Sequence, residues 1–198
     1  MLTRNPHTID SALQELKDGN KRFVDNRPLH CHQDKALLDH LSAHGQTPLA
    51  AILGCSDSRV PLELLFDQGF GDLFVVRVAG NILGEDETAS LEYAVDHLGV
   101  PLVVVLGHTK CGAVSAAVQG ATAPGALGHL LERLKSVIQS VAGLPEDQKE
   151  AAAIRRNVEL GVNLLTTHSP ALAGAAREGR ARIIGAVYQV EDRRVVFI

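Results

Sequence analysis

The sequence predicts an α/β fold: a central, mostly parallel sheet of about four to five strands, flanked by helices. Short runs that are apolar throughout, such as 49–53 and 102–106, are typical of strands covered on both faces. Stretches of helical period separate these runs, and such an alternation of strand and helix builds βαβ units and parallel sheets. No repeat, low-complexity tract or linker divides the chain, so residues 1–198 are expected to form one domain.

Helix signals and strand runs alternate through the first half of the chain. Thr8 can cap a first helix, Gly45 can end a second, and Pro61 suits the first turn of a third. Gly99 can end a fourth helix, whose leucines and valines recur at helical spacing. The elements expected in this half are helices at 8–25, 35–44, 61–68 and 87–98 and strands at 49–54, 73–78 and 101–106.

The second half is richer in helix. Apolar residues from Leu127 to Val141 form a continuous helical stripe, which predicts a single helix over that stretch. Pro170 suits the start of a short helix and Gly179 its end. The other elements expected here are helices at 113–118 and 146–167, a strand at 182–190, and an edge strand at 195–198 that pairs with it.

Composition excludes several classes of partner. The formal net charge is −4 and no cluster of lysines and arginines forms a basic stripe, which argues against nucleic acid and anionic membranes as partners. The longest apolar runs are strand-sized, well below the roughly 20 residues of a membrane-spanning helix. Residues 1–6 lack the apolar core of a signal peptide, so a cytoplasmic location is expected.

The three cysteines favour metal or catalytic use. An odd number in a chain without a secretion signal argues against a disulfide framework. Cys31 lies between His30 and His32 in a polar loop, and we interpret this group as an incidental surface cluster. Cys55 and Cys111 are the stronger candidates, because each follows a predicted strand and has another potential ligand beside it.

Four potential metal ligands follow two of the predicted strands. Cys55 and Asp57 come after the strand at 49–54, and His108 and Cys111 come after the strand at 101–106. In open α/β sheets ligands bind beyond the carboxyl ends of the strands, where strand order reverses, so we expect these side chains to meet in one pocket. Two thiolates, an imidazole and a carboxylate suit tetrahedral zinc.

Arg59 decides whether such a site is open or closed. With Asp57 as fourth ligand the zinc would have no place for water, whereas catalytic zinc keeps one position open. If Arg59 binds the carboxylate in a bidentate pair, Asp57 leaves the metal and water can bind. The residues permit both states.

Three motifs resemble those of the β-class carbonic anhydrases. They are C-x-D-x-R at Cys55–Arg59, R-x-A-G-N at Arg77–Asn81 and H-x-x-C-G at His108–Gly112. The similarity runs from Gly19–Phe23 to Tyr188–Val190, and the whole chain is therefore expected to be a single domain of this type.

The resemblance implies a metal site and a reaction. It implies one Zn²⁺ per chain on Cys55, His108 and Cys111, with Asp57 as a further ligand only in a closed state. The implied reaction is the reversible hydration of carbon dioxide to bicarbonate and a proton, by a zinc-bound hydroxide that the Asp57–Arg59 dyad orients. Family members form homodimers or homotetramers, and the N-terminal helices are expected to pack on a partner subunit.

The resemblance also implies a substrate pocket. Arg77, Gly112 and Tyr188 are the residues it assigns to binding carbon dioxide or bicarbonate. Members regulated by bicarbonate carry a tryptophan three residues before the first cysteine. That position is Ile52 here, and the chain has no tryptophan.

Two other functions fit the same residues. A related hydrolase could act on carbonyl sulfide or carbon disulfide, which are linear analogues of carbon dioxide. A closed site of two cysteines, a histidine and an aspartate could instead hold a purely structural zinc in an interaction module. An arginine beside the metal would have little purpose in that second case.

Overall fold

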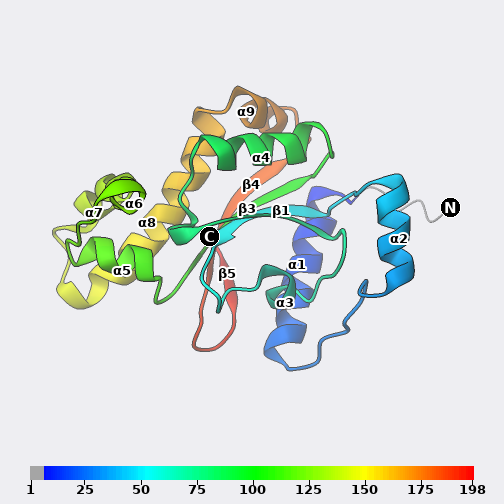
Figure 1. Cartoon of the computed structure of the whole chain (residues 1–198), viewed down its shortest axis with the longest axis horizontal. Helices are drawn as coiled ribbons and strands as arrows, with labels where there is room; N and C mark the ends of the chain where they lie inside the picture. The colour runs from blue at the N-terminus through cyan, green and yellow to red at the C-terminus, as the bar shows by residue number, and fades with distance from the viewer. Residues whose placement is uncertain (1–6) are drawn as a thin grey trace.

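A computed structural model describes residues 7–198 and has the predicted α/β architecture (Figure 1). Five strands form one sheet in the order β2-β1-β3-β4-β5. The first four are parallel, and β5 runs antiparallel to β4 at the edge. The strands are β1 (Ala50–Cys55), β2 (Leu73–Val78), β3 (Leu102–His108), β4 (Arg182–Tyr188) and β5 (Val195–Phe197).

Helices cover both faces of the sheet (Figure 1). The helices α1 (Ile9–Val24) and α3 (Leu62–Leu65) pack on one face. The opposite face is covered mainly by α4 (Glu85–Asp96), α5 (Gly112–Val118), α7 (Lys135–Val141), α8 (Glu146–Thr167) and α9 (Pro170–Arg177). The other helical segments are α2 (Lys35–His44), the 3-10 turn η1 (Ala79–Asn81) and α6 (Gly125–Arg133).

The central strands are buried on both faces, as their continuous apolar character predicts. In β1, Leu53 contributes to the core on the α8 side, while Ile52 contributes to the core on the α1 side. Val105 and Val104 divide in the same way in β3. Successive side chains of a strand point to opposite faces, so these runs need apolar residues at every position.

The N-terminal helix α1 packs against the backbone that follows α3, and a glycine lies at the contact. A Cβ atom built on Gly19 of α1 would lie 1.8 Å from the carbonyl oxygen of Phe66, the residue that follows α3. Phe66 is itself fully buried. The next residue of α1, Asn20, donates a hydrogen bond from Nδ2 to the carbonyl of Leu65 at 3.1 Å. Gly19 therefore allows α1 to approach the backbone at the end of α3 closely.

Replacing Gly19 with alanine is expected to destabilise the protein. Alanine favours a helix over glycine by about 1 kcal/mol, but overpacking against backbone costs roughly 1–3 kcal/mol and cannot be relieved by a side-chain rotation. We expect a net loss of about 1–2 kcal/mol, measured by urea unfolding. Gly143→Ala is the control, because an added Cβ there meets nothing within 4 Å. Equal stability of the two variants would contradict the close approach.

Two predicted helices differ from the structure. The helix expected at 61–68 ends at Leu65, because Asp67 adopts a left-handed conformation (φ 48°) in which its carboxylate accepts hydrogen bonds from the amides of Leu29 and His30. The helix expected from 127 to 141 is broken between α6 and α7. The break lies at Leu134, whose side chain is fully buried in the core.

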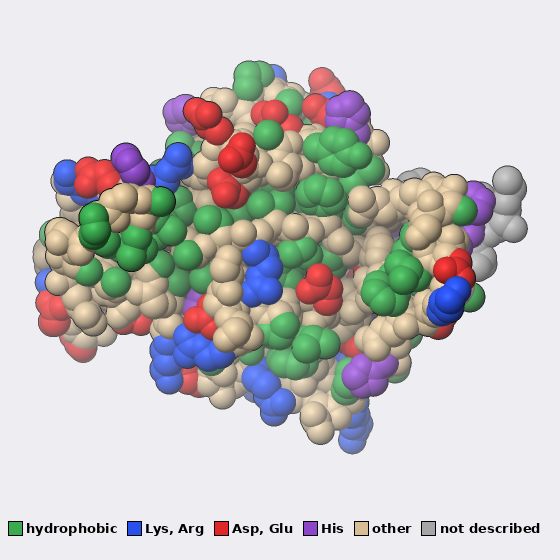
Figure 2. All heavy atoms as spheres, viewed as in Figure 1, with side chains coloured by type: hydrophobic (Ala, Val, Ile, Leu, Met, Phe, Trp, Pro, Cys, Tyr) green, Lys and Arg blue, Asp and Glu red, His purple; other side chains and the backbone are tan. Residues whose placement is uncertain are grey.

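One face of the molecule is mixed in charge. On the face shown in Figure 2, basic and acidic side chains are interspersed, and apolar side chains reach the surface among them. No helix within residues 7–198 has both the length and the apolar character needed to cross a bilayer. Residues 1–6, whose composition suggests a cytoplasmic location, lie outside the described part of the chain.

Candidate metal centre

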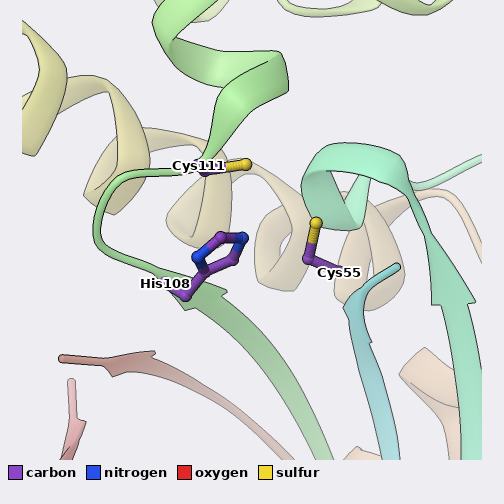
Figure 3. Close-up of side chains that lie close together, drawn as sticks. All are labelled: Cys55, His108 and Cys111. Atoms are coloured by element: carbon purple, nitrogen blue, oxygen red, sulfur yellow. The ribbon is translucent and has the colours of Figure 1, made fainter. Parts of the chain in front are cut away.

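Three potential ligands converge where β1 and β3 end side by side (Figure 3). Cys55 is the last residue of β1 and His108 the last residue of β3, while Cys111 is the N-cap of α5. One ligand atom from each lies within 4.8 Å of the other two, and all three residues are buried. The predicted meeting of these side chains at the carboxyl edge of the sheet is thus present.

The imidazole of His108 is oriented to bind an ion. Its Nδ1 lies 2.9 Å from the carbonyl oxygen of Thr109. Because a carbonyl can only accept, Nδ1 carries the proton and Nε2 has a free lone pair. Nε2 is buried and has no hydrogen-bond partner among the described residues. Burying a nitrogen without a hydrogen-bond partner costs folding free energy, and a metal ion bound at Nε2 would remove that cost.

The thiol of Cys55 lies in surroundings that favour its ionised form. Its Sγ accepts hydrogen bonds from the amides of Gly80 at 3.2 Å and Asp57 at 3.4 Å. The neighbouring thiol of Cys111, the ring of His108 and these amides lower the pKa of Cys55, against the opposing effect of burial. The hydrogen bond with Cys55 and burial raise the pKa of Cys111. At least one thiolate, the form that binds metals, is therefore favoured before any ion enters.

A buried asparagine that the sequence analysis did not identify supports this arrangement. Asn157 of α8 donates a hydrogen bond from Nδ2 to the carbonyl of Gly80 at 2.8 Å. Gly80 has a φ of 70° and donates its amide to Cys55. The available signal was a polar side chain on the otherwise apolar inner face of α8, beside Ile154 and Val158.

Removing this asparagine is expected to weaken metal binding. Asn157→Leu keeps a similar volume but removes the hydrogen bond that holds the Gly80 turn beside Cys55. Replacing a residue that supports metal ligands costs about 10–100-fold in metal affinity. We expect at least a tenfold weaker affinity, measured by competition with a chelator. Asn163→Leu, on the exposed side of the same helix, should bind metal as the unaltered chain does. An unchanged affinity in Asn157→Leu would contradict the supporting role.

Asp57 is paired with Arg59 and is not part of the three-residue group. The guanidinium donates from Nε to Oδ1 at 3.0 Å and from Nη2 to Oδ2 at 2.7 Å, while the amide of Arg59 also donates to Oδ1 at 2.9 Å. These bonds hold the pKa of Asp57 well below its usual range. Among the described residues only Cys55, His108 and Cys111 form a potential metal-binding group. The structure therefore has the arrangement expected of an open site.

The predicted substrate residues lie at the same edge of the sheet but differ in their contacts. Arg77 donates to the carbonyls of Cys55 at 2.9 Å and Asp57 at 2.8 Å, so it supports the loop between them. Gly112 is the first residue of α5, and a Cβ there would meet nothing within 4 Å. Tyr188 pairs in register with His108, but its side chain is buried in the core on the α1 side.

Two further positions singled out in the sequence lie away from the three ligands. Ile52 is fully buried within β1 on the α1 side. Cys31 is exposed, and the Nδ1 of His32 lies 2.7 Å from the carboxylate of Asp72. This contact joins the loop after α1 to the segment before β2.

Comparison with known proteins identifies the family. A family model for carbonic anhydrase matches residues 50–195. Carbonic anhydrase 2 of Mycobacterium tuberculosis is 43% identical over 197 residues, covering 94% of this chain and 91% of that protein. A carbonic anhydrase of Pseudomonas aeruginosa is 36% identical and covers 92% of this chain and 86% of its own length.

Solved structures agree with this assignment. The fold matches a tetrameric β-carbonic anhydrase of Sordaria macrospora with a TM-score of 0.75 and 30% identity, over 81% of this chain and 85% of the other. It matches the β-carbonic anhydrase CafA of Aspergillus fumigatus with the same TM-score and 29% identity, over 96% and 89%. The chain therefore belongs to the β-carbonic anhydrases, lyases that hydrate carbon dioxide.

Proposed function

We propose that this chain catalyses the reversible hydration of carbon dioxide to bicarbonate and a proton, with one Zn²⁺ per chain held by Cys55, His108 and Cys111. The observation that carries the proposal is the buried group of two sulfurs and a nitrogen that has no other partner. Zn²⁺ accepts this combination of soft and imidazole ligands in tetrahedral sites, and three protein ligands leave one position for water.

The proposed roles of Asp57 and Arg59 follow from their hydrogen bonds. A Zn²⁺ held there would lower the pKa of water from 15.7 toward the value of about 7 known for an all-histidine zinc site, and so would supply a nucleophile near neutral pH. Arg59 occupies both carboxylate oxygens of Asp57 and keeps the carboxylate ionised. Asp57 then serves as a fixed hydrogen-bond acceptor for the attacking water and directs its lone pair toward carbon dioxide.

The other residues of the proposed site hold or contact these groups. Arg77 keeps the loop from Cys55 to Asp57 in place through two backbone carbonyls. It stays a prediction that carbon dioxide or bicarbonate is contacted by Arg77, Gly112 and Tyr188.

We also propose that the chain forms a single domain and a homodimer or homotetramer. The relative from Sordaria macrospora is described as tetrameric. None of the residues of α2 is buried within the chain, and Leu38 of this helix is 44% exposed, which supports packing of the N-terminal helices on a partner subunit. Sedimentation velocity would measure the assembly. A cytoplasmic location stays a prediction.

Stopped-flow assays of carbon dioxide hydration test the proposed activity. The purified protein should contain one zinc per chain, lose hydration activity when a chelator removes the metal, and regain it when Zn²⁺ is restored. Carbonyl sulfide and carbon disulfide should be assayed in parallel by release of sulfide. Preference for either sulfur compound would favour the related hydrolase. Bound zinc that stabilises the fold without any hydration activity would favour a structural site.

A further inference from the structure

Arg59 is held from a second direction, by the loop that carries two of the ligands. Besides its two bonds to Asp57, the Arg59 guanidinium donates from Nη2 to the carbonyl oxygen of Lys110 at 3.0 Å. Arg59 is 48% exposed at its side chain, so packing alone does not fix its position. The position of the Lys110 carbonyl therefore contributes to the orientation of the Asp57–Arg59 pair.

The conformation of Lys110 requires support from outside the loop. Lys110 has a φ of 56°, in the left-handed region that residues other than glycine disfavour. Glu191, in the turn between β4 and β5, binds this loop at two points. Thr109 donates from Oγ1 to Glu191 Oε2 at 2.7 Å, and the Lys110 ammonium lies 3.0 Å from Oε1. One carboxylate thus clamps the two residues between the ligands His108 and Cys111.

The turn that carries Glu191 is itself anchored to the core. The amide of Val190 donates to Thr109 Oγ1 at 2.9 Å, which completes a closed set of bonds between the turn and the loop. At the other end of the turn, the amide of Val195 donates to Oδ1 of the buried Asn20 at 2.8 Å, and Asn20 Nδ2 donates to the carbonyl of Arg193 at 3.1 Å. The side chain of Glu191 is therefore exposed, while hydrogen bonds hold the backbone of its turn in place.

We propose that Glu191, acting with Thr109, is a positioning residue that keeps Arg59 paired with Asp57 by holding the carbonyl of Lys110 in place. Its bonds to Thr109 and Lys110 lower the pKa of Glu191 to about 2, so its carboxylate is ionised at neutral pH. The inference rests on the proposed function, because it assigns Glu191 to the same reaction.

Turnover of the zinc-loaded enzyme tests this role. In Glu191→Ala we expect kcat to fall by about 10- to 100-fold, with one zinc still bound per chain. This is the size of effect seen when residues that support metal ligands are replaced. Glu191→Gln can still accept the bond from Thr109 and should retain most of the activity. Asp192→Asn is the control: it removes the neighbouring charge of the same turn, keeps an acceptor for the amide of Arg194, and should leave kcat unchanged.

A double-mutant cycle shows whether Glu191 acts through Arg59. If it does, Glu191→Ala should have no further effect on kcat in an Arg59→Ala background. The proposal would be overturned if the fold loss of kcat in the double variant equalled the product of the two single losses. A kcat within twofold of the unaltered enzyme in Glu191→Ala alone would also overturn it.

A readout independent of turnover separates this inference from the proposed activity. A crystal structure of zinc-loaded Glu191→Ala should show the Lys110 carbonyl displaced and the bidentate Arg59–Asp57 pair broken or split between conformers. An intact pair in that structure would overturn the role of Glu191. If the unaltered enzyme shows no carbon dioxide hydration while the pair is lost in the variant, the proposed function fails and the positioning role stands.

Discussion

Replacing Cys55 with serine is expected to remove both the metal and the activity. Cys55 supplies one of three ligand atoms, and its Sγ accepts two backbone amides that a serine oxygen can also accept, so the fold should survive. Replacing a residue that supports metal ligands lowers metal affinity or activity about 10–100-fold, and replacing a ligand itself should have a larger effect. We expect zinc content well below one per chain and kcat/KM reduced by more than about 10²-fold.

The third cysteine provides the matched control for this experiment. Cys31 is exposed and lies outside the three-residue group, so Cys31→Ser should keep full zinc content and activity. Zinc content would be measured by atomic emission, and folding by circular dichroism. Retention of stoichiometric zinc in Cys55→Ser, or equal losses in both variants, would contradict the assigned metal centre.

The sequence allowed the convergence of Cys55, His108 and Cys111 to be predicted because these residues follow a local pattern combined with a topological rule. Cys55 and His108 end apolar runs, and Cys111 follows three residues after His108, at a predicted helix start. Parallel strands place their carboxyl ends at one edge of the sheet, and β1 lies between β2 and β3, so Cys55 comes beside His108.

Contacts between residues far apart in the sequence could not be predicted in this way. Asn157 reaches the Gly80 turn across 77 residues, and Glu191 reaches Thr109 across 82. No periodicity links such positions. The break at Leu134 was missed for a related reason, because the apolar stripe continues through it and only tertiary packing shows that the chain bends there to bury that leucine.

Replacing Asp57 with asparagine is expected to reduce turnover while the metal stays bound. The amide keeps the size of the side chain but loses one acceptor oxygen and the charge that pairs with Arg59. Loss of one preorganised electrostatic group costs about 10²–10³-fold in kcat. We therefore expect a loss of that size in carbon dioxide hydration, with zinc still at one per chain. Loss of the zinc in Asp57→Asn would contradict the assigned role.

Replacing Arg59 with alanine should have a comparable effect for a different reason. The change frees both oxygens of Asp57, whose carboxylate is then available as a fourth ligand for zinc in place of water. We expect zinc content to be retained, kcat to fall by about 10²-fold or more, and a crystal structure of the zinc-loaded variant to show Asp57 on the metal. A structure with water still bound to zinc would refute this switch.

A second arginine of the chain shows whether the effect of Arg59 is local. Arg180 binds Glu178, which is also two residues away, at 2.7 Å, and its side chain is 48% exposed, as that of Arg59 is. Exposed ion pairs contribute about 0–1 kcal/mol to stability, so neither Arg180→Ala nor Arg59→Ala should unfold the protein. Arg180→Ala should therefore keep full activity. A difference of about 10²-fold in kcat between two variants of similar stability can only come from the position of Arg59 beside the three ligands.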